Sequence, residues 1–395
     1  MSETIHSDYV PLQEETRAIE QADQYDREIR QQGLLYTDEK VTDYLGRVEA
    51  RLLARQAPLQ DSIGLFVMRS PSPNAFAFPN GNIYLHAGIF TTLDSEDELA
   101  AIAAHEIAHI TERHSIKAVI ANKKKLIGSH IADFATGGFG LVYFGTFASI
   151  MHFSREQESA ADRIGMTLLA EAGYRPQAML EAFESLDLYP ELRHQKNSIY
   201  SSHPTFRARI NELRTMAAEQ EQLAGLTDVP DSTFSELKAM MMEDSLRIRL
   251  RNREYNLSLT ILKAADGYFG DTAKGNFYRV EFYYGFYKYP ELAAREYHFI
   301  QTGKDKADKD ATAKFVAEKE RNLAAAIQHY QSASKHATPY AKSFRRLGDI
   351  EQARGNSKQA LDYFTRYLVL QPDASDRSYV EHAMRRLGDQ TGEHL

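Results

Sequence analysis

Apolar residues recur at helical spacing through most of the chain, with an exception between residues 63 and 85. The segment 12–56 shows the helical spacing on both sides of Gly33, which predicts two helices interrupted at that glycine. Residues 63–68 and 82–85 are short apolar runs, and the turn-forming segments 70–73 and 79–81 lie between them, which predicts strands. The pattern therefore predicts an α+β fold, mostly α, in which helices pack on a small sheet.

The run 99–110 predicts a buried helix. Leu99, Ile102 and Ile107 recur at helical spacing, and alanines fill much of the space between them. Ser95 and Glu98 precede the run with the three-residue spacing of a capping box. We expect this helix to be central in its domain.

The composition becomes polar after about residue 217, which predicts a linker at 221–235 between a domain spanning 1–220 and a helical domain spanning 236–395. A period of about 34 residues is clearest near the end of the chain. Six residues occupy the positions that a tetratricopeptide repeat (TPR) fills with an aromatic residue, Leu-Gly, Ala, a second aromatic residue and Pro: Phe344, Leu347, Gly348, Ala360, Phe364 and Pro372. Because such repeats bury their apolar faces against neighbouring repeats, we expect an α-helical TPR solenoid. An unrelated helical bundle is the alternative.

Composition and charge exclude some classes of function. The 395 residues include 47 basic and 55 acidic ones, and the net charge of -8 argues against a nucleic-acid surface. The chain has no cysteine, so it offers neither a disulfide framework nor a thiol nucleophile. The first twenty residues are polar and contain no signal-peptide core.

The segment 134–153 contains no Asp, Glu, Lys or Arg and is long enough to cross a bilayer. Four glycines dilute its hydrophobicity, and it lies between two helices that must converge if they share a metal. We therefore expect a buried or cleft-covering hairpin. The sequence leaves it undecided whether the protein acts close to a membrane, and we expect no transmembrane span.

A zinc-hydrolase pattern lies within the central helix. His105 and His109 are four residues apart, so on a helix they share one face and can bind one ion, while Glu106 can act on a water molecule. A third ligand must come from elsewhere. The metzincin solution requires a glycine at position 112 and a histidine at position 115, where the chain has Glu112 and Ser115. His114 lies five residues past His109, off the shared face, and is expected to pack or to meet solvent.

Carboxylates that can complete the site follow at 156–162. Glu158 and Asp162 are four residues apart, so one can bind the metal while the other orients a histidine. The alternative is a charged helix start with no role in metal binding.

Four motifs in this order resemble the gluzincin metallopeptidase family that contains HtpX, the CaaX prenyl proteases and BepA. They are the HExxH segment 105–109, the ExxxD segment 158–162, the segment 74–84 and the His-Pro segment 202–210. The resemblance covers roughly residues 40–215. It implies a zincin-type helical peptidase domain with one catalytic Zn²⁺. It also implies that the segment 126–153 is a lid or plug over the active site.

The resemblance also implies roles for individual residues. Zinc would be held by His105, His109 and Glu158, with Asp162 supporting a ligand and Glu106 as general base. An edge strand that includes Asn74, Ala75, Phe76 and Ala77 would bind substrate as an added strand. His203 and Arg209 would stabilise an oxyanion, or His203 would instead coordinate the zinc and inhibit the enzyme.

These expectations combine into a zinc endopeptidase acting on unfolded or misassembled envelope proteins, with a TPR domain that binds a protein partner. Relatives of the BepA kind are exported, so we expect a periplasmic protein whose signal peptide has been removed. A cytoplasmic location is the alternative. The other functional hypothesis is a TPR chaperone or scaffold with a latent, self-inhibited zinc site.

Overall fold

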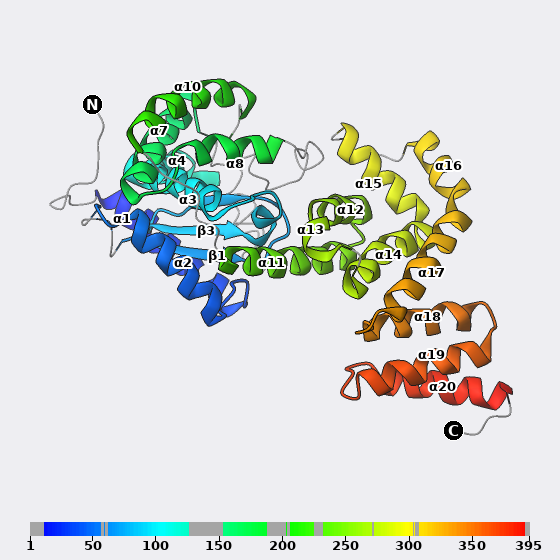
Figure 1. Cartoon of the computed structure of the whole chain (residues 1–395). Helices are drawn as coiled ribbons and strands as arrows, with labels where there is room; N and C mark the ends of the chain where they lie inside the picture. Colours follow the sequence, from blue (N-terminus) through cyan, green and yellow to red (C-terminus); the bar gives the residue numbers. More distant parts are fainter. Residues whose placement is uncertain are drawn as a thin grey trace. The chain divides into compact units, whose positions relative to one another are not determined.

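The computed structural model describes residues 12–56, 59, 62–125, 153–187, 203, 206–224, 232–270, 272–302, 304 and 308–391. The contacts divide the chain into two units, Met1–Ser245 and Leu246–Leu395 (Figure 1). The expected lid lies outside the described residues except for Phe153, and so does most of the expected linker. The division between the units falls within α11 (Ser232–Arg251), and the boundary at 221–235 stays a prediction.

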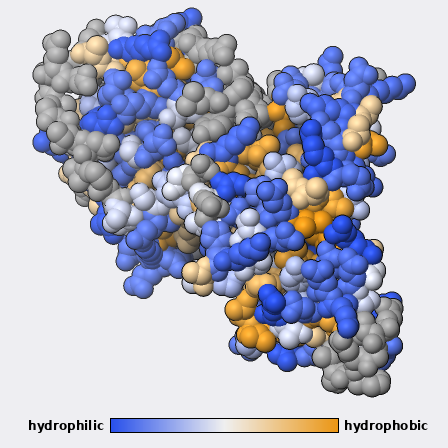
Figure 2. Space-filling model, turned by 45° about the vertical axis from the view of Figure 1, so that its right-hand side comes forward, coloured by the Kyte–Doolittle hydropathy of each residue, from blue (hydrophilic) through white to orange (hydrophobic). Residues whose placement is uncertain are grey.

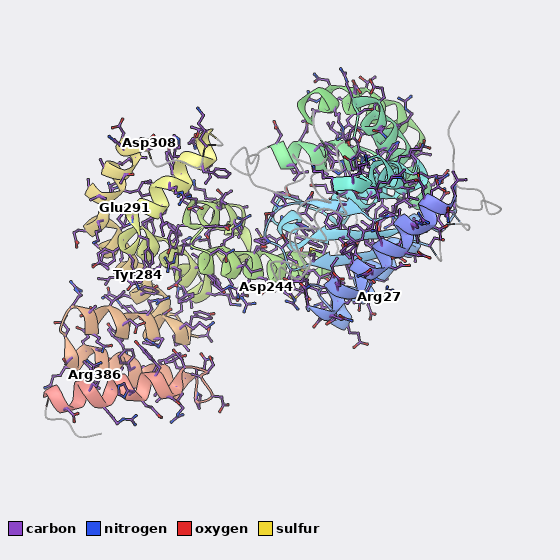
Figure 3. All side chains as sticks on the ribbon, turned by 180° about the vertical axis from the view of Figure 1, so that it is seen from behind. Arg27, Asp244, Tyr284, Glu291, Asp308 and Arg386 are labelled. Carbon is purple, nitrogen blue, oxygen red and sulfur yellow. The ribbon has the colours of Figure 1, made fainter. Side chains whose placement is uncertain are left out.

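Two helices begin the first unit, as the apolar spacing predicts. They are α1 (Gln13–Gln31) and α2 (Glu39–Leu52), and Gly33 lies between them in the left-handed region with φ +65°. Asp38 caps α2 by accepting a hydrogen bond from the Lys40 N–H. Figure 3 labels Arg27 on α1, where it is exposed, whereas Tyr25 and Ile29 of the same helix are buried.

A three-stranded sheet follows, in the order β1 (Gly64–Met68), β3 (Asn82–His86), β2 (Ala75–Ala77). β1 runs parallel to β3 and β2 runs antiparallel to it, with Ala75 opposite Leu85. Side chains alternate between the two faces. Ile83 and Leu85 join the core that contains α3 (Glu96–Thr111), whereas Tyr84 packs with the buried residues of α1.

Strand β2 packs against α3. Ala75 and Ala77 point into the same core as α3, and their small side chains suit the packing of this strand against the helix. β2 is an edge strand in the order of this sheet, as the family resemblance implies for this segment.

The central helix α3 is buried from Asp97 to Thr111 without interruption. Ser95 caps it by accepting from the Glu98 N–H at 3.2 Å, as the sequence predicts. The Glu98 carboxylate accepts from the Asp94 N–H instead of the Ser95 N–H. A short helix, α4 (His114–Ala121), follows almost at once.

Helix α7 (Arg155–Ala172) is the main partner of α3. Ser154 and Gln157 form its capping box, and Gly173 ends it in the left-handed conformation with φ +77°. Gly165 lies against α3, and a Cβ there would lie 3.2 Å from the backbone nitrogen of His105. Helices α8 (Gln177–Asp187) and α10 (Phe206–Ala224) complete this layer, with α10 packed on α8 and α7.

The second unit consists of helices in its described residues. They are α12 (Tyr255–Ala264), α13 (Asp266–Phe269), α14 (Ala273–Lys288), α15 (Pro290–Thr302), α16 (Lys309–Ala317), α17 (Lys319–Lys335), α18 (Ala341–Ala353), α19 (Ser357–Leu370) and α20 (Arg377–Thr391). Helix α18 packs on α19, and α19 on α20. Gly348 allows the first of these contacts, because a Cβ there would lie 2.4 Å from the Phe364 ring. Helix α14 packs mainly on α17, although α15 and α16 lie between them in the sequence.

The fold is α+β and mostly α, which confirms the class predicted from the sequence. Within the described ranges, we find no helix with the length and hydrophobicity that a membrane span requires. Figure 2 shows a largely hydrophilic surface with separate apolar patches. The large apolar side chains exposed among the described residues are Leu12 and six in the second unit: Leu292, Tyr297, Val316, Val369, Leu370 and Tyr379.

Candidate metal centre

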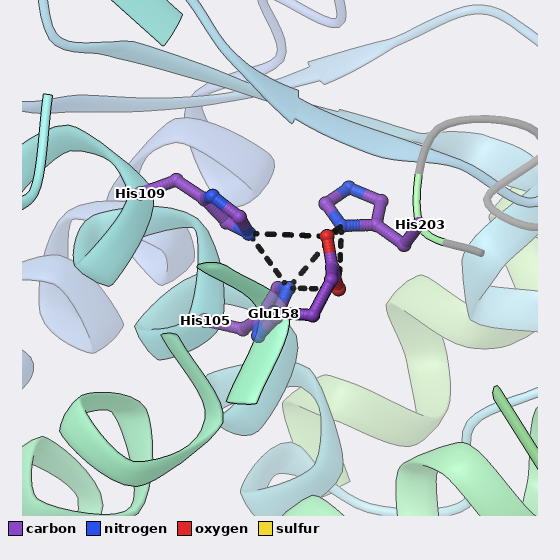
Figure 4. A group of neighbouring side chains, drawn as sticks. All are labelled: His105, His109, Glu158 and His203. Atoms are coloured by element: carbon purple, nitrogen blue, oxygen red, sulfur yellow. Dashed lines mark hydrogen bonds and ion pairs between the residues drawn. The ribbon is translucent and has the colours of Figure 1, made fainter. Parts of the chain in front are cut away.

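Helices α3 and α7 bring two imidazoles and a carboxylate together at the centre of the first unit (Figure 4). The Nε2 atoms of His105 and His109 are 3.1 Å apart, because a four-residue separation places both rings on one face of α3. Glu158 of α7 approaches with its carboxylate oxygens 3.6 Å from His105 Nε2 and 3.7 Å from His109 Nε2. All three side chains are buried.

His203 is the fourth member of this group. Its Nδ1 lies 3.0 Å from Glu158 Oε1 and 3.3 Å from His105 Nε2, and its Nε2 lies 3.3 Å from Glu106 Oε1. One potential ligand atom from each of His105, His109, Glu158 and His203 lies within 4.8 Å of the others. His203 therefore faces both a predicted ligand and the predicted general base.

The donor set fits zinc. Zinc takes nitrogen and oxygen ligands at about 2.0–2.1 Å in a tetrahedron, so its ligand atoms lie about 3.3 Å apart. The separations between His105, His109 and Glu158 range from 3.1 to 3.7 Å. These three residues could hold the ion, and two imidazoles with one carboxylate are a common zinc set.

Asp162 and Arg209 support the group from behind. Asp162 Oδ1 lies 3.1 Å from His105 Nδ1, on the side of the ring away from Glu158. The Arg209 guanidinium donates to both Asp162 oxygens and to Glu158, and its Nε lies 2.9 Å from Asp162 Oδ2. Arg209 is fully buried and lies over the Phe183 ring at 4.5 Å. Arg209 therefore donates its hydrogen bonds to the carboxylates of Asp162 and Glu158. The spacing of the motifs alone does not predict this role.

The charges of these groups shift one another's pKa values. Burial alone would raise the pKa of Asp162, but Arg209 and His105 outweigh it and lower the pKa to about 2. Burial opposes the shift at Glu158 too, where His203 and Arg209 hold the pKa below its ordinary value. Burial lowers the pKa of His109 well below its ordinary value, with neighbouring histidines and Arg209 adding to the effect. Glu158 and His109 thus favour the protonation states that bind a cation.

His114 does not lie where the helical spacing predicts. It is buried, and its Nδ1 lies 2.9 Å from His109 Nδ1. Burial lowers the pKa of His114 to about 4. The sequence interpretation missed this contact because it assumed a continuous helix, whereas α3 ends before Arg113.

The expected substrate strand lies at the sheet edge beside α3. The Asn74 carbonyl accepts from the His86 N–H at 2.9 Å, and the Phe78 N–H donates to the Asn82 carbonyl at 2.8 Å. Because alternate residues of an antiparallel strand bond to the same neighbour, the main-chain groups of Ala75 and Ala77 point away from β3.

Fold and site together define the N-terminal unit as a metallopeptidase domain of the HExxH class. Residues 40–217 match the model of Peptidase family M48. The match confirms the gluzincin resemblance and its extent.

Similar proteins carry related names. The chain is 28% identical over 217 residues to the beta-barrel assembly-enhancing protease of Escherichia coli (strain K12), an alignment that covers 52% of this chain and 45% of that protein. It is 26% identical over 247 residues to the mitochondrial metalloendopeptidase OMA1 of Schizosaccharomyces pombe, covering 59% of this chain and 73% of that protein. The chain thus spans less than half the length of the bacterial relative.

Proposed function

We propose that this chain is a zinc-dependent endopeptidase. The observation that carries the proposal is the buried convergence of His105, His109 and Glu158, at separations suited to one zinc ion, beside the Glu106 carboxylate. When bound, zinc would supply Lewis acidity to a water molecule and to the scissile carbonyl.

The protein's own groups perform the proton transfers. Glu106 accepts a proton from the attacking water and later donates it to the leaving nitrogen of the cleaved peptide bond. Asp162 holds the His105 ring through Nδ1, and Arg209 holds both Asp162 and Glu158. Arg209 then acts through these carboxylates, and its predicted role as an oxyanion donor would require it to release one of them.

The edge strand would bind the substrate. Ala75 and Ala77 offer main-chain donors and acceptors on the side of β2 away from β3, so an extended peptide can add there as a fourth strand. Binding through main-chain groups tolerates many sequences, which suits a protease for unfolded chains.

His203 favours a second state of the same site. Its Nδ1 lies 3.0 Å from Glu158 and 3.3 Å from His105, separations that suit a fourth tetrahedral ligand. A zinc ion with four protein ligands has no open position for water, so we propose that His203 holds the enzyme in a latent state. The alternative function, a chaperone or scaffold with a self-inhibited zinc site, rests on this geometry.

We propose that the second unit contains TPR repeats and binds a protein partner. Its support is the close contact between Gly348 and Phe364, two residues at positions of the repeat motif, and the six exposed apolar side chains of this unit. The relatives named for beta-barrel assembly favour a periplasmic location and envelope-protein substrates. The mitochondrial relatives share the domain, so the domain itself does not specify a compartment.

The test is cleavage of unfolded casein by the purified full chain, with and without a chelator. We expect cleavage to stop on chelation and to return with added zinc. Glu106→Gln should lower the rate by at least about 100-fold and leave one equivalent of zinc bound. Cleavage by this variant at the wild-type rate would contradict the proposed base.

A second variant separates the two states of His203. If His203 is an inhibitory ligand, His203→Ala should raise the cleavage rate. If it is an oxyanion donor, the same change should lower the rate. If neither the wild type nor His203→Ala cleaves casein but both still bind it, the chaperone function is favoured.

A further inference from the structure

A residue with an unusual backbone conformation follows the central helix. Arg113 separates α3 from α4 and has φ 60° and ψ 28°, in the left-handed region. A residue with a bulky side chain seldom adopts this conformation, which costs about 1–2 kcal/mol. Arg113 is buried and forms an ion pair with Glu15 of α1, so packing between helices holds the break in place.

The break changes the direction in which His114 points. On a continuous helix, a residue five positions after His109 is rotated by about 140° away from it. The left-handed turn at Arg113 instead returns His114 toward His109, with ring centroids 5.0 Å apart. The two Nδ1 atoms then lie 2.9 Å apart.

Two ring nitrogens at this distance must share one hydrogen. His109 directs Nε2 toward His105 and Glu158, so Nε2 carries the lone pair that would bind the metal. A neutral imidazole with its lone pair on Nε2 has its hydrogen on Nδ1. His109 is therefore the donor, and His114 Nδ1 is the acceptor.

We propose that His114 is a positioning residue of the metal centre, which fixes the tautomer and ring orientation of His109 by accepting its Nδ1 hydrogen. This inference rests on the proposed function, in which His109 is a metal ligand. The other ligand histidine, His105, has Asp162 at its Nδ1, so each ring has a partner on the side away from the centre. The break at Arg113 supplies that partner for His109 from the next helix.

Two variants of similar size test the proposal. His114→Asn places an amide oxygen near the position of the imidazole Nδ1 and can accept the same hydrogen, whereas His114→Leu fills the space without an acceptor. Zinc affinity of the full chain is measured by competition with a chromogenic chelator. We expect His114→Leu to weaken zinc binding by about 10- to 100-fold, and His114→Asn to remain within about threefold of wild type.

The outcomes distinguish the role of His114 from the existence of the metal centre. Zinc affinity of His114→Leu within threefold of wild type would overturn the positioning role, and so would equal losses in both variants. Thermal unfolding of both zinc-free variants shows whether either has lost the fold, and Asn rescue distinguishes an acceptor from a packing group. If wild type and Glu158→Gln bind zinc equally, the proposed metal centre itself is wrong.

Discussion

Asp162 is the carboxylate through which α7 orients His105. It lies 3.1 Å from His105 Nδ1 and shares the Arg209 guanidinium with Glu158. A ligand histidine held in this way keeps its ring orientation when no ion is bound, which lowers the cost of assembling the site.

Replacing Asp162 by Asn should therefore weaken zinc binding by about 10- to 100-fold. The amide retains the volume but loses the charge that pairs with Arg209. The measurement is chelator competition on the full chain, and Glu156→Gln on the exposed side of the same helix is the control. Unchanged affinity in Asp162→Asn would mean that His105 needs no carboxylate behind it.

The spacing of single residues predicts part of this centre and misses the rest. His105, Glu106 and His109 follow from the geometry of one helix, and Glu158 with Asp162 from that of another. The contact between His109 and His114 does not follow, because it depends on a left-handed Arg113 that propensity disfavours. The contacts of Arg209 depend on tertiary packing, which brings α10 against α7.

The approach of α7 to α3 sets the distance between the carboxylate and the histidines. Gly165 makes this approach possible, since an added Cβ would lie 2.7 Å from the Met179 side chain and 3.2 Å from the backbone nitrogen of His105. The methionine side chain can move, whereas the α3 backbone cannot move without shifting His105.

Gly165→Ala should therefore destabilise the protein by about 1–3 kcal/mol and weaken zinc binding. Gly46→Ala is the matched control, because Gly46 lies within α2 with open space around it. This substitution should stabilise the protein by about 0.5–1 kcal/mol. Urea unfolding and chelator competition measure the two effects. Stabilisation by both substitutions would show that α7 is not closely packed at this point.

In the second unit, a half-buried carboxylate caps one of the helices. Glu296 of α15 accepts from the backbone N–H groups of Asn256 and Leu257, so it caps α12 from another helix. Burial raises the pKa of Glu296 from 4.5 to about 7, although these hydrogen bonds oppose the shift.

This shift predicts a pH dependence of stability. The folded state binds the proton more tightly than the unfolded state, so the stabilisation is complete below pH 4.5 and is lost as pH rises through 7. The loss is at most about 3 kcal/mol. Glu296→Gln should reduce this slope in urea unfolding between pH 5 and 8, and the exposed Glu291→Gln should keep it. The same slope in Glu296→Gln would assign the pH dependence to other groups.

At the level of elements, turn-forming residues made prediction reliable near the sheet and near Gly33. The partner of α14 was not predictable, because two helices separate it from α17 in the sequence. Helical spacing shows which residues of α14 are apolar but does not show which helix they meet.

The two units have different sources of stability. The first contains all four members of the metal group, and the second contains none of them. Metal binding should therefore stabilise only the first unit, because a ligand stabilises the cooperative unit that contains its site.

Calorimetry of the full chain should show this separation. With free zinc at a thousand times its dissociation constant, the first unit gains about 4 kcal/mol, so chelation should lower its unfolding temperature and leave that of the second unit unchanged. Glu158→Gln is the control, since it removes a proposed ligand while Asp162 still pairs with Arg209. Its first transition should respond little to zinc or chelator. A shift of both transitions on chelation would mean that the units unfold as one, and the metal centre would then govern the helical unit as well as its own.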